Sequence, residues 1–265
     1  MKIEKPRILI FIVAYKAESH IESVLDRIPS DIWESNKFDT EILVVDDASG
    51  DETAKRATQH MKENYRNNMV VLENQTNQGY GGNQKIGYNY AIKNNFDIVV
   101  LLHGDGQYAP EYLHDMVDPL VDRQVDAVFG SRMLKRKDAL KGGMPLYKYA
   151  GNKILTKIQN LILGTHLSEF HSGYRAYRVG VLKSIPLQYN SNDFDFDTDI
   201  IIQLVDNKLS IAEVPIPTFY GDEICYVNGI KYAINIVITT ILSRLQLFGI
   251  TYNLKFDYSG FKFGK

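Results

Sequence analysis

The stretch from Ile98 to Gln107 constrains the fold of this chain more than any other. It reads Ile-Val-Val-Leu-Leu-His-Gly-Asp-Gly-Gln. Its five apolar residues follow one another without the 3.6-residue break of an amphipathic helix, which predicts a strand buried on both faces. Strands of this kind belong to parallel sheets, and such sheets bind ligands at the carboxyl ends of their strands. We therefore expect a parallel α/β sheet with its site directly after residue 102.

Polar side chains begin where this apolar run ends. His103, Asp105 and Gln107 alternate with glycines, and alternation in an extended chain places all three side chains on one side. Gly104 and Gly106 allow another group to approach the backbone closely. One carboxylate, one imidazole and one amide oxygen can hold a divalent ion, and Mg²⁺ or Mn²⁺ typically also takes phosphate oxygens and waters. The alternative is a strand that ends in a polar glycine turn.

Strand and helix patterns alternate along most of the chain. The expected strands are 7–13, 41–45, 69–73, 98–102, 127–129 and 211–217, the last at an edge of the sheet because of its prolines. The expected helices are 19–28, 52–64, 83–94, 110–122, 146–163, 179–185 and 198–207. Residues 77–83 form a predicted glycine-rich loop, and 135–143 a basic mobile loop that contacts anions or is a solvated turn. This repetition indicates a doubly wound sheet.

The loops after the predicted strands carry the candidate site. Right-handed crossovers bring these loops to one edge of the sheet: Tyr15, Asp46, Asp47, Gly79–Gly82, Asp105 and Arg132. Asp46 and Asp47 point to opposite sides of an extended chain, so we expect one to face a nucleotide and the other to secure the loop. We assign Asp47 to the nucleotide. Lys85 can reach a phosphate or lie on the surface of its helix.

Composition limits the class of protein. A formal net charge of −2 over 265 residues gives no general attraction to nucleic acid, and no nucleic-acid partner is expected. The single cysteine, Cys225, excludes an internal disulfide and suits a reducing compartment. The first apolar run is short and lacks a small-residue cleavage site. We interpret it as a strand rather than a signal peptide and expect a cytoplasmic location.

Three segments in this order resemble family 2 glycosyltransferases: Val44–Thr53, the loop from Asn77 to Gly87, and His103–Gln107. Within that family the chain is similar to the dolichyl- and polyprenyl-phosphate sugar transferases, over about residues 7–220. The resemblance implies an α/β GT-A fold, a Rossmann-like three-layer sandwich with a mostly parallel sheet, over residues 1–222. It also implies inverting transfer of a sugar from a UDP- or GDP-sugar, aided by Mg²⁺ or Mn²⁺.

The resemblance assigns roles to individual residues. Ala14, Tyr15 and Asp47 would line the base and ribose, while Asp105 and Gln107 would hold the metal on the diphosphate. The full set expected at the nucleotide sugar is Ala14, Tyr15, Glu18, Asp47, Gly79, Lys85, Gly104 and Asp105. His103 stands where many members carry the first Asp of an Asp-x-Asp motif, and we count it as a third candidate metal ligand. Ala17 stands where many members carry Glu, a role that Glu18 can fill.

Departure of the diphosphate requires positive charge, which a metal ion or arginines can supply. The expected catalytic residues are Asp105, Asp197, Arg132 and Arg175. Arg132 follows a strand end and either faces a phosphate or forms a surface salt bridge. The segment from Ser172 to Arg178 resembles the family segment near the acceptor site, where Arg175 and Arg178 on a turn would face a lipid phosphate together. Asp197 is either a general base for a hydroxyl acceptor or a helix cap, whereas a phosphate acceptor needs no base.

Several functions stay open at this point. The acceptor is a polyprenyl or dolichyl phosphate, or a growing glycan in cell-surface polysaccharide synthesis. A nucleotidyltransferase would carry a glycine-rich loop after the first strand, but residues 14–18 contain no glycine. A non-catalytic sugar-nucleotide-binding module would explain His103 and Ala17, whereas intact Asp47 and Asp105 oppose it.

Residues 223–265 form a predicted helical tail. The segment from Tyr232 to Leu242 is almost wholly apolar but too short to span a bilayer as a helix. Lys231 and Arg244 flank it, which is typical of a helix that lies in the membrane interface. The alternatives are docking on the core of the protein and docking on a second subunit in a homo-oligomer. The first interpretation predicts peripheral contact with the cytoplasmic face of the membrane.

Overall fold

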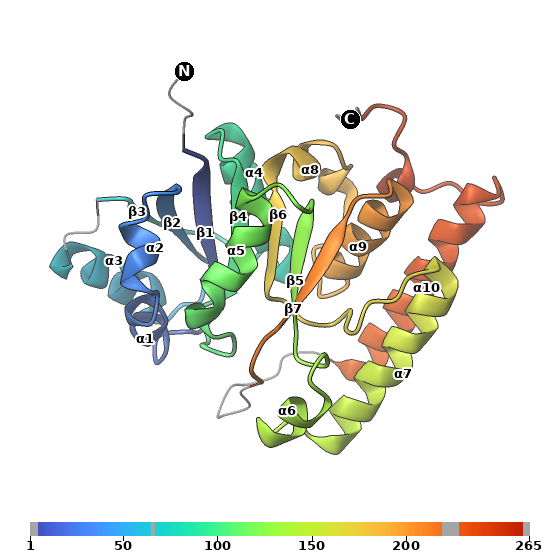
Figure 1. Cartoon of the computed structure of the whole chain (residues 1–265), viewed down its shortest axis with the longest axis horizontal. Helices are drawn as coiled ribbons and strands as arrows, with labels where there is room; N and C mark the ends of the chain where they lie inside the picture. The colour runs from blue at the N-terminus through green and yellow to red at the C-terminus, as the bar shows by residue number, and fades with distance from the viewer. Residues whose placement is uncertain (1–4, 65–66, 219–227, 262–265) are drawn as a thin grey trace.

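The computed structural model describes residues 5–64, 67–218 and 228–261, without the side chains of 136–138. Its centre is a seven-stranded sheet in the order β3-β2-β1-β4-β6-β5-β7 (Figure 1). The strands are β1 Arg7–Ala14, β2 Asp39–Asp46, β3 Met69–Glu73, β4 Ile98–His103, β5 Ala127–Ser131, β6 Arg175–Arg178 and β7 Ile211–Pro215. Every pairing is parallel except those of β6, which runs antiparallel to β4 and β5. The mostly parallel sheet and the edge position of β7 are therefore confirmed.

Helices cover both faces of this sheet. The α-helices are α1 Ile21–Asp26, α2 Ser30–Trp33, α3 Thr53–Glu63, α4 Tyr80–Lys93, α5 Leu113–Val121, α6 Arg136–Lys141, α7 Leu146–Leu163, α8 Val179–Lys183, α9 Phe196–Asp206 and α10 Gly229–Leu247. Three 3₁₀ turns complete the set: η1 Pro110–Tyr112, η2 Leu187–Tyr189 and η3 Leu254–Phe256. Alternate residues of β1 enter two separate cores, with Ile8, Ile10 and Ile12 on one side and Leu9 and Phe11 on the other. This is the expected three-layer sandwich.

The sequence did not predict β6, and the reason lies in its residues. Arg175–Arg178 was expected as a turn with both arginines facing a ligand together, but it is an inner strand of the sheet. Arg175 is fully buried, whereas Arg178 donates hydrogen bonds to the carbonyls of Val125 and Leu120. The expectation of a shared arginine face is therefore wrong.

Two predicted loops contain helix. The basic segment expected as a mobile loop includes α6. Helix α4 begins at Tyr80, three residues earlier than expected, because the N–H groups of Gly81 and Gly82 donate to the carbonyl of Asn192 at 2.9 and 3.2 Å. A Cβ atom on Gly81 would lie 2.5 Å from the carbonyl oxygen of Ser191. These glycines therefore serve close packing of a helix on its neighbour.

Helix α10 packs against α7 and α9 at the edge of the molecule (Figure 1). Among the described residues, no helix combines the length and the apolar character needed to cross a membrane. The expected boundary between 222 and 223, and Cys225, lie outside the described residues. The oligomer and membrane interpretations of this tail stay predictions.

Candidate active site

The loops after β1, β2 and β4 meet at one edge of the sheet, as the sequence predicts. In the strand register Ala14 lies beside Asp46, and Val13 lies beside His103. The N–H of Asp47 donates to the carbonyl of Ala14 at 2.9 Å, and the N–H of Gly104 donates to the carbonyl of Val13 at 2.8 Å. Backbone hydrogen bonds therefore hold the aspartate loop and the glycine turn on the same end of β1.

Asp105 lies at this edge and not in the apolar interior. Gly104 packs so closely on the β1 loop that a Cβ atom there would lie 3.1 Å from the Cβ of Ala14. The Asp105 side chain is half-buried, and its Oδ1 accepts a hydrogen bond from the N–H of Gln107 at 3.0 Å. Gln107 is half-buried as well. Both candidate metal ligands are thus accessible beside the end of β1.

Both adjacent aspartates of the β2 loop organise backbone. Asp47 Oδ1 accepts from the N–H of Gln78 at 2.8 Å, and its Oδ2 accepts from the N–H of Gly79 at 3.0 Å. Asp46 accepts hydrogen bonds from the N–H and the hydroxyl of Ser49, while burial raises the pKa of Asp46. Securing a loop is therefore common to the two residues. The further role of Asp47 toward a nucleotide stays a prediction.

A chain of hydrogen bonds joins three elements across the site. The Tyr80 hydroxyl donates to Asp197 Oδ2 at 3.0 Å and lies 3.3 Å from His103 Nε2. Because its single hydrogen is directed at the carboxylate, the imidazole Nε2–H is the donor in the second contact. Burial lowers the pKa of His103, against the charges of Asp105 and Asp197. Burial therefore disfavours the charged form of His103.

Asp197 is held rather than exposed. The residue is 6% exposed, and its Oδ1 accepts from the amide of Gln84 at 3.3 Å and lies 3.8 Å from Arg175 Nε. Asp197 lies in the first turn of α9, where it makes no side-chain cap. The helix-cap interpretation is therefore wrong, and the observed partners of this carboxylate are side chains of α4 and β6.

The two candidate arginines are buried in the protein. Arg175 donates to the carbonyls of Ser172 and Phe170, and although burial opposes its charge, Asp197 raises its pKa. Arg132 donates to both carboxylate oxygens of Glu169, through its backbone N–H at 2.7 Å and its side chain. The expectation of a surface salt bridge is wrong, because both partners are buried.

Three other predicted residues lie around the edge with different partners. The Lys85 ammonium donates to Asn192 Oδ1 at 2.7 Å and to the carbonyl of Asn190, so it ties α4 to the segment before α9. Glu18 accepts from the N–H of Glu52 at 3.0 Å, next to the start of α3. Tyr15 is exposed on the β1 loop. The structure does not bring Lys85 or Glu18 into the His103–Tyr80–Asp197 chain.

Sequence reasoning missed Glu169 and Tyr108. Glu169 holds Arg132 and is 37 positions away from it, and no local pattern marks that pairing. Tyr108 follows directly after the predicted metal turn and accepts from the N–H of Gly173 at 2.7 Å, beside the His103 ring. Its position next to Gln107 is the one signal that was available.

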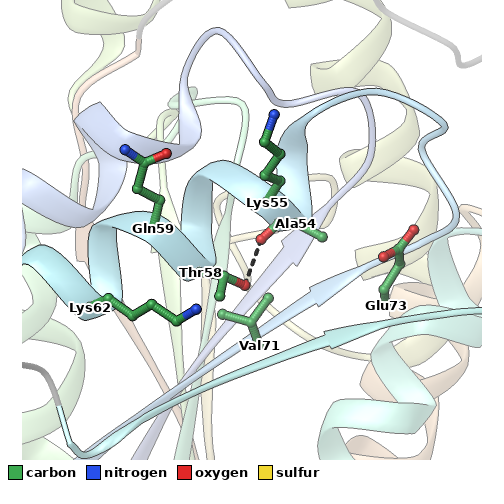
Figure 2. Close-up of a pocket in the computed structure, with 7 residues that line it drawn as sticks. All are labelled: Ala54, Lys55, Thr58, Gln59, Lys62, Val71 and Glu73. Atoms are coloured by element: carbon green, nitrogen blue, oxygen red, sulfur yellow. Dashed lines mark hydrogen bonds between the residues drawn. The ribbon is translucent and has the colours of Figure 1, made fainter.

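One groove lies away from this edge. This groove, between α3 and β3, has a volume of about 490 Å³. Figure 2 shows the residues that line it: Ala54, Lys55, Thr58, Gln59, Lys62, Val71 and Glu73. None of the predicted site residues lines it. The candidate site is therefore defined by the strand ends and not by this groove.

Comparison with known proteins identifies the family. The description "Glycosyl transferase family 2" matches residues 9–185, which is more than half of the chain. The chain belongs to glycosyl transferase family 2. It is 30% identical over 229 residues to the UDP-N-acetylglucosamine–dolichyl-phosphate N-acetylglucosaminyltransferase of Methanococcus voltae, covering 81% of this chain and 86% of the relative. It is also 30% identical over 223 residues to the undecaprenyl-phosphate mannosyltransferase of Micrococcus luteus, covering 82% and 85%.

Solved structures support the same fold. Glucosyl-3-phosphoglycerate synthase from Mycobacterium tuberculosis, in complex with UDP, aligns with a TM-score of 0.67 at 20% identity, over 94% of this chain and 82% of that one. The same synthase has been crystallised with Mg²⁺ and UDP. The family 2 chain is thus a glycosyltransferase with the GT-A fold that the sequence predicts.

Proposed function

We propose that this glycosyltransferase transfers a sugar, with inversion, from a UDP- or GDP-sugar to a polyprenyl or dolichyl phosphate, aided by Mg²⁺ or Mn²⁺. The observation that carries the proposal is the half-buried carboxylate of Asp105 beside the pinned ends of β1 and β2. The names of the two relatives described above, which act on dolichyl and undecaprenyl phosphate, support the acceptor class.

The residues at this edge fit a divalent ion that takes some of its ligands from the substrate. Within the described ranges, no three His, Cys, Asp or Glu side chains are grouped so as to hold a metal. Mg²⁺ is commonly bound by one or two carboxylates, with substrate phosphates and waters as the other ligands. Asp105 would supply the carboxylate and Gln107 an amide oxygen, while His103, which contacts Tyr80, is the weaker third candidate. When bound, the ion would neutralise charge that develops on the leaving diphosphate.

The burial and the hydrogen bonds of Asp197 favour an acceptor that needs no general base. A sugar hydroxyl must lose a proton when it attacks, whereas a phosphate oxygen is already ionised. Asp197 is buried and accepts hydrogen bonds from Tyr80 and Gln84. These contacts hold the two side chains in place, and the carboxylate also lies beside the positive charge of Arg175. These contacts support a phosphate acceptor over a glycan hydroxyl.

The test combines nucleotide binding with an acceptor panel. We expect UDP or GDP to raise the melting temperature only in the presence of Mn²⁺ or Mg²⁺, and a chelator to abolish the increase. Asp105→Asn should lose the effect, while Asp115→Asn, an exposed carboxylate on α5, should keep it. Sugar transfer should then occur to a short polyprenyl phosphate and not to an oligosaccharide. Nucleotide stabilisation that ignores both the chelator and Asp105→Asn would contradict the metal site.

A further inference from the structure

Helices α7 and α10 direct large apolar side chains away from the protein. The exposed ones are Leu146, Tyr147, Ile154 and Leu161 on α7, with Ile230, Ile234, Ile238 and Ile241 on α10. Tyr147, Ile154 and Leu161 are seven residues apart, and the four isoleucines of α10 are three or four residues apart, so these residues lie on one side of each helix. Leu146 precedes Tyr147 at the start of α7. We call these eight residues the outer face. Leu161 is 84% exposed and Ile154 is 60% exposed, so nothing in the described chain covers the centre of α7.

The opposite sides of the same helices bury several polar side chains. Helix α7 buries Asn152, Thr156 and Gln159 together with Leu163, and α10 buries Thr240 and Ser243 together with Ile236. A helix on the surface of a protein in water usually keeps its apolar stripe toward the core, whereas here most of the buried residues are polar and large apolar side chains are exposed. Polar side chains between packed helices and apolar side chains outside them are typical of helices in contact with lipid. Figure 1 shows α7 and α10 side by side at the edge of the molecule.

The charged residues of α7 and α10 favour an anionic lipid surface. Neither helix contains an aspartate or glutamate, although the whole chain has a net charge of −2. Lys153 and Lys157 of α7 and Lys231 of α10 are exposed on these helices. A second copy of the chain would bring its own lysines against them, whereas anionic lipid headgroups attract basic residues next to an apolar surface.

We propose that the outer face lies in the headgroup region of an anionic bilayer, with α7 and α10 along the membrane plane. Neither helix is suited to cross the bilayer. The proposal rests on the function proposed above. It extends the membrane contact that the sequence predicts for the tail to a surface made by two helices.

The inner sides of these helices contact residues directly before Ser172, where the candidate acceptor segment begins. The Tyr232 hydroxyl of α10 lies 2.8 Å from His171 Nδ1, and the Asn152 amide of α7 donates to Glu169 Oε1 at 2.7 Å. Glu169 in turn holds Arg132. The two helices that would meet the membrane are therefore in direct contact with the residues 169–171. A lipid phosphate in the same headgroup layer would lie on the side of the protein where we expect the acceptor.

Vesicle flotation of the whole chain tests this surface. We expect the chain to float with vesicles of phosphatidylcholine and phosphatidylglycerol, and more weakly with phosphatidylcholine alone. Leu161→Gln combined with Ile238→Gln should lower the bound-to-free ratio about a hundredfold, roughly tenfold for each apolar side chain. Leu72→Gln, an exposed apolar residue on the edge strand β3, is the matched control and should bind like the unaltered chain. Equal flotation of the double variant would overturn the proposal.

A second measurement separates the alternatives. Sedimentation without vesicles reports the mass of the chain, and a dimer that the double variant dissociates would mean that a second copy covers the outer face. The increase in melting temperature with nucleotide and Mn²⁺, measured without vesicles, should be unchanged in the double variant, which also shows that it folds. Flotation without that nucleotide effect would refute the proposed function alone, and the nucleotide effect without flotation would refute the membrane surface alone.

Discussion

Replacing Tyr80 by phenylalanine removes the hydroxyl that joins His103 to Asp197 and leaves the ring in place. The ring stacks on Phe194 with centroids 5.1 Å apart, and that contact should persist. The lost hydrogen bond runs to a buried carboxylate at 3.0 Å, and such bonds contribute about 1.5–3 kcal/mol. Because Gln84 still donates to Asp197, we expect a loss near the middle of that range, about 2 kcal/mol.

Denaturant unfolding with a matched control measures this loss. For a chain of this size, about 2 kcal/mol corresponds to a fall of roughly 4–8 °C in melting temperature. Tyr90→Phe is the control, because Tyr90 lies on the same helix and its hydroxyl donates to Glu41 at 2.7 Å in a more open setting. We expect that change to cost less than about 1 kcal/mol. Equal losses in the two variants would refute the hydrogen-bond chain through Tyr80.

Two further predictions concern the same region. Burial lowers the pKa of His171 to about 4, below its value of about 6.5 in an unfolded chain, so the unfolded chain binds the proton first. The resulting stability, up to about 3 kcal/mol, is present above pH 6.5 and lost as the pH falls toward 4. His171→Gln should flatten this pH dependence of unfolding, and His20→Gln, at an exposed position, should not. Gly173→Ala would place a Cβ atom 2.6 Å from His103 Nε2, so we expect sugar transfer to fall more than tenfold while Gly180→Ala, with open space around its Cβ, stays active.

The apolar runs were sufficient to predict the strands that form the site. Residues of β1 and β4 are buried on both faces, so their sequence is determined by the core, and the place of Asp105 follows from the end of β4. Strand β6 escaped prediction because Arg175 and Tyr177 look polar, although both are fully buried. The buried guanidinium is stabilised by backbone carbonyls and by Asp197. The local sequence around Arg175 does not indicate these partners.

The glycine-rich segment shows the same limit. Glycine permits a flexible loop and also permits two backbones to approach closely, and a single sequence does not distinguish these uses. Here the second use prevails, because the carbonyls of Ser191 and Asn192 occupy the space that Cβ atoms would need. The result is a helix whose first residue, Tyr80, has a fixed direction toward Asp197.

The carboxylates around the candidate site differ in whether their negative charge is available to a ligand. Asp46, Asp47, Asp197 and Glu169 are all buried, and hydrogen-bond donors from the loops or from buried side chains engage each of them. These donors stabilise the negative charge of the four groups, and burial limits their access to a ligand. Asp105 is half-buried, and the hydrogen bond recorded for it comes from its own turn. Among these five groups, Asp105 is the most accessible to a cationic ligand. For this reason the test of the proposed function begins with its substitution.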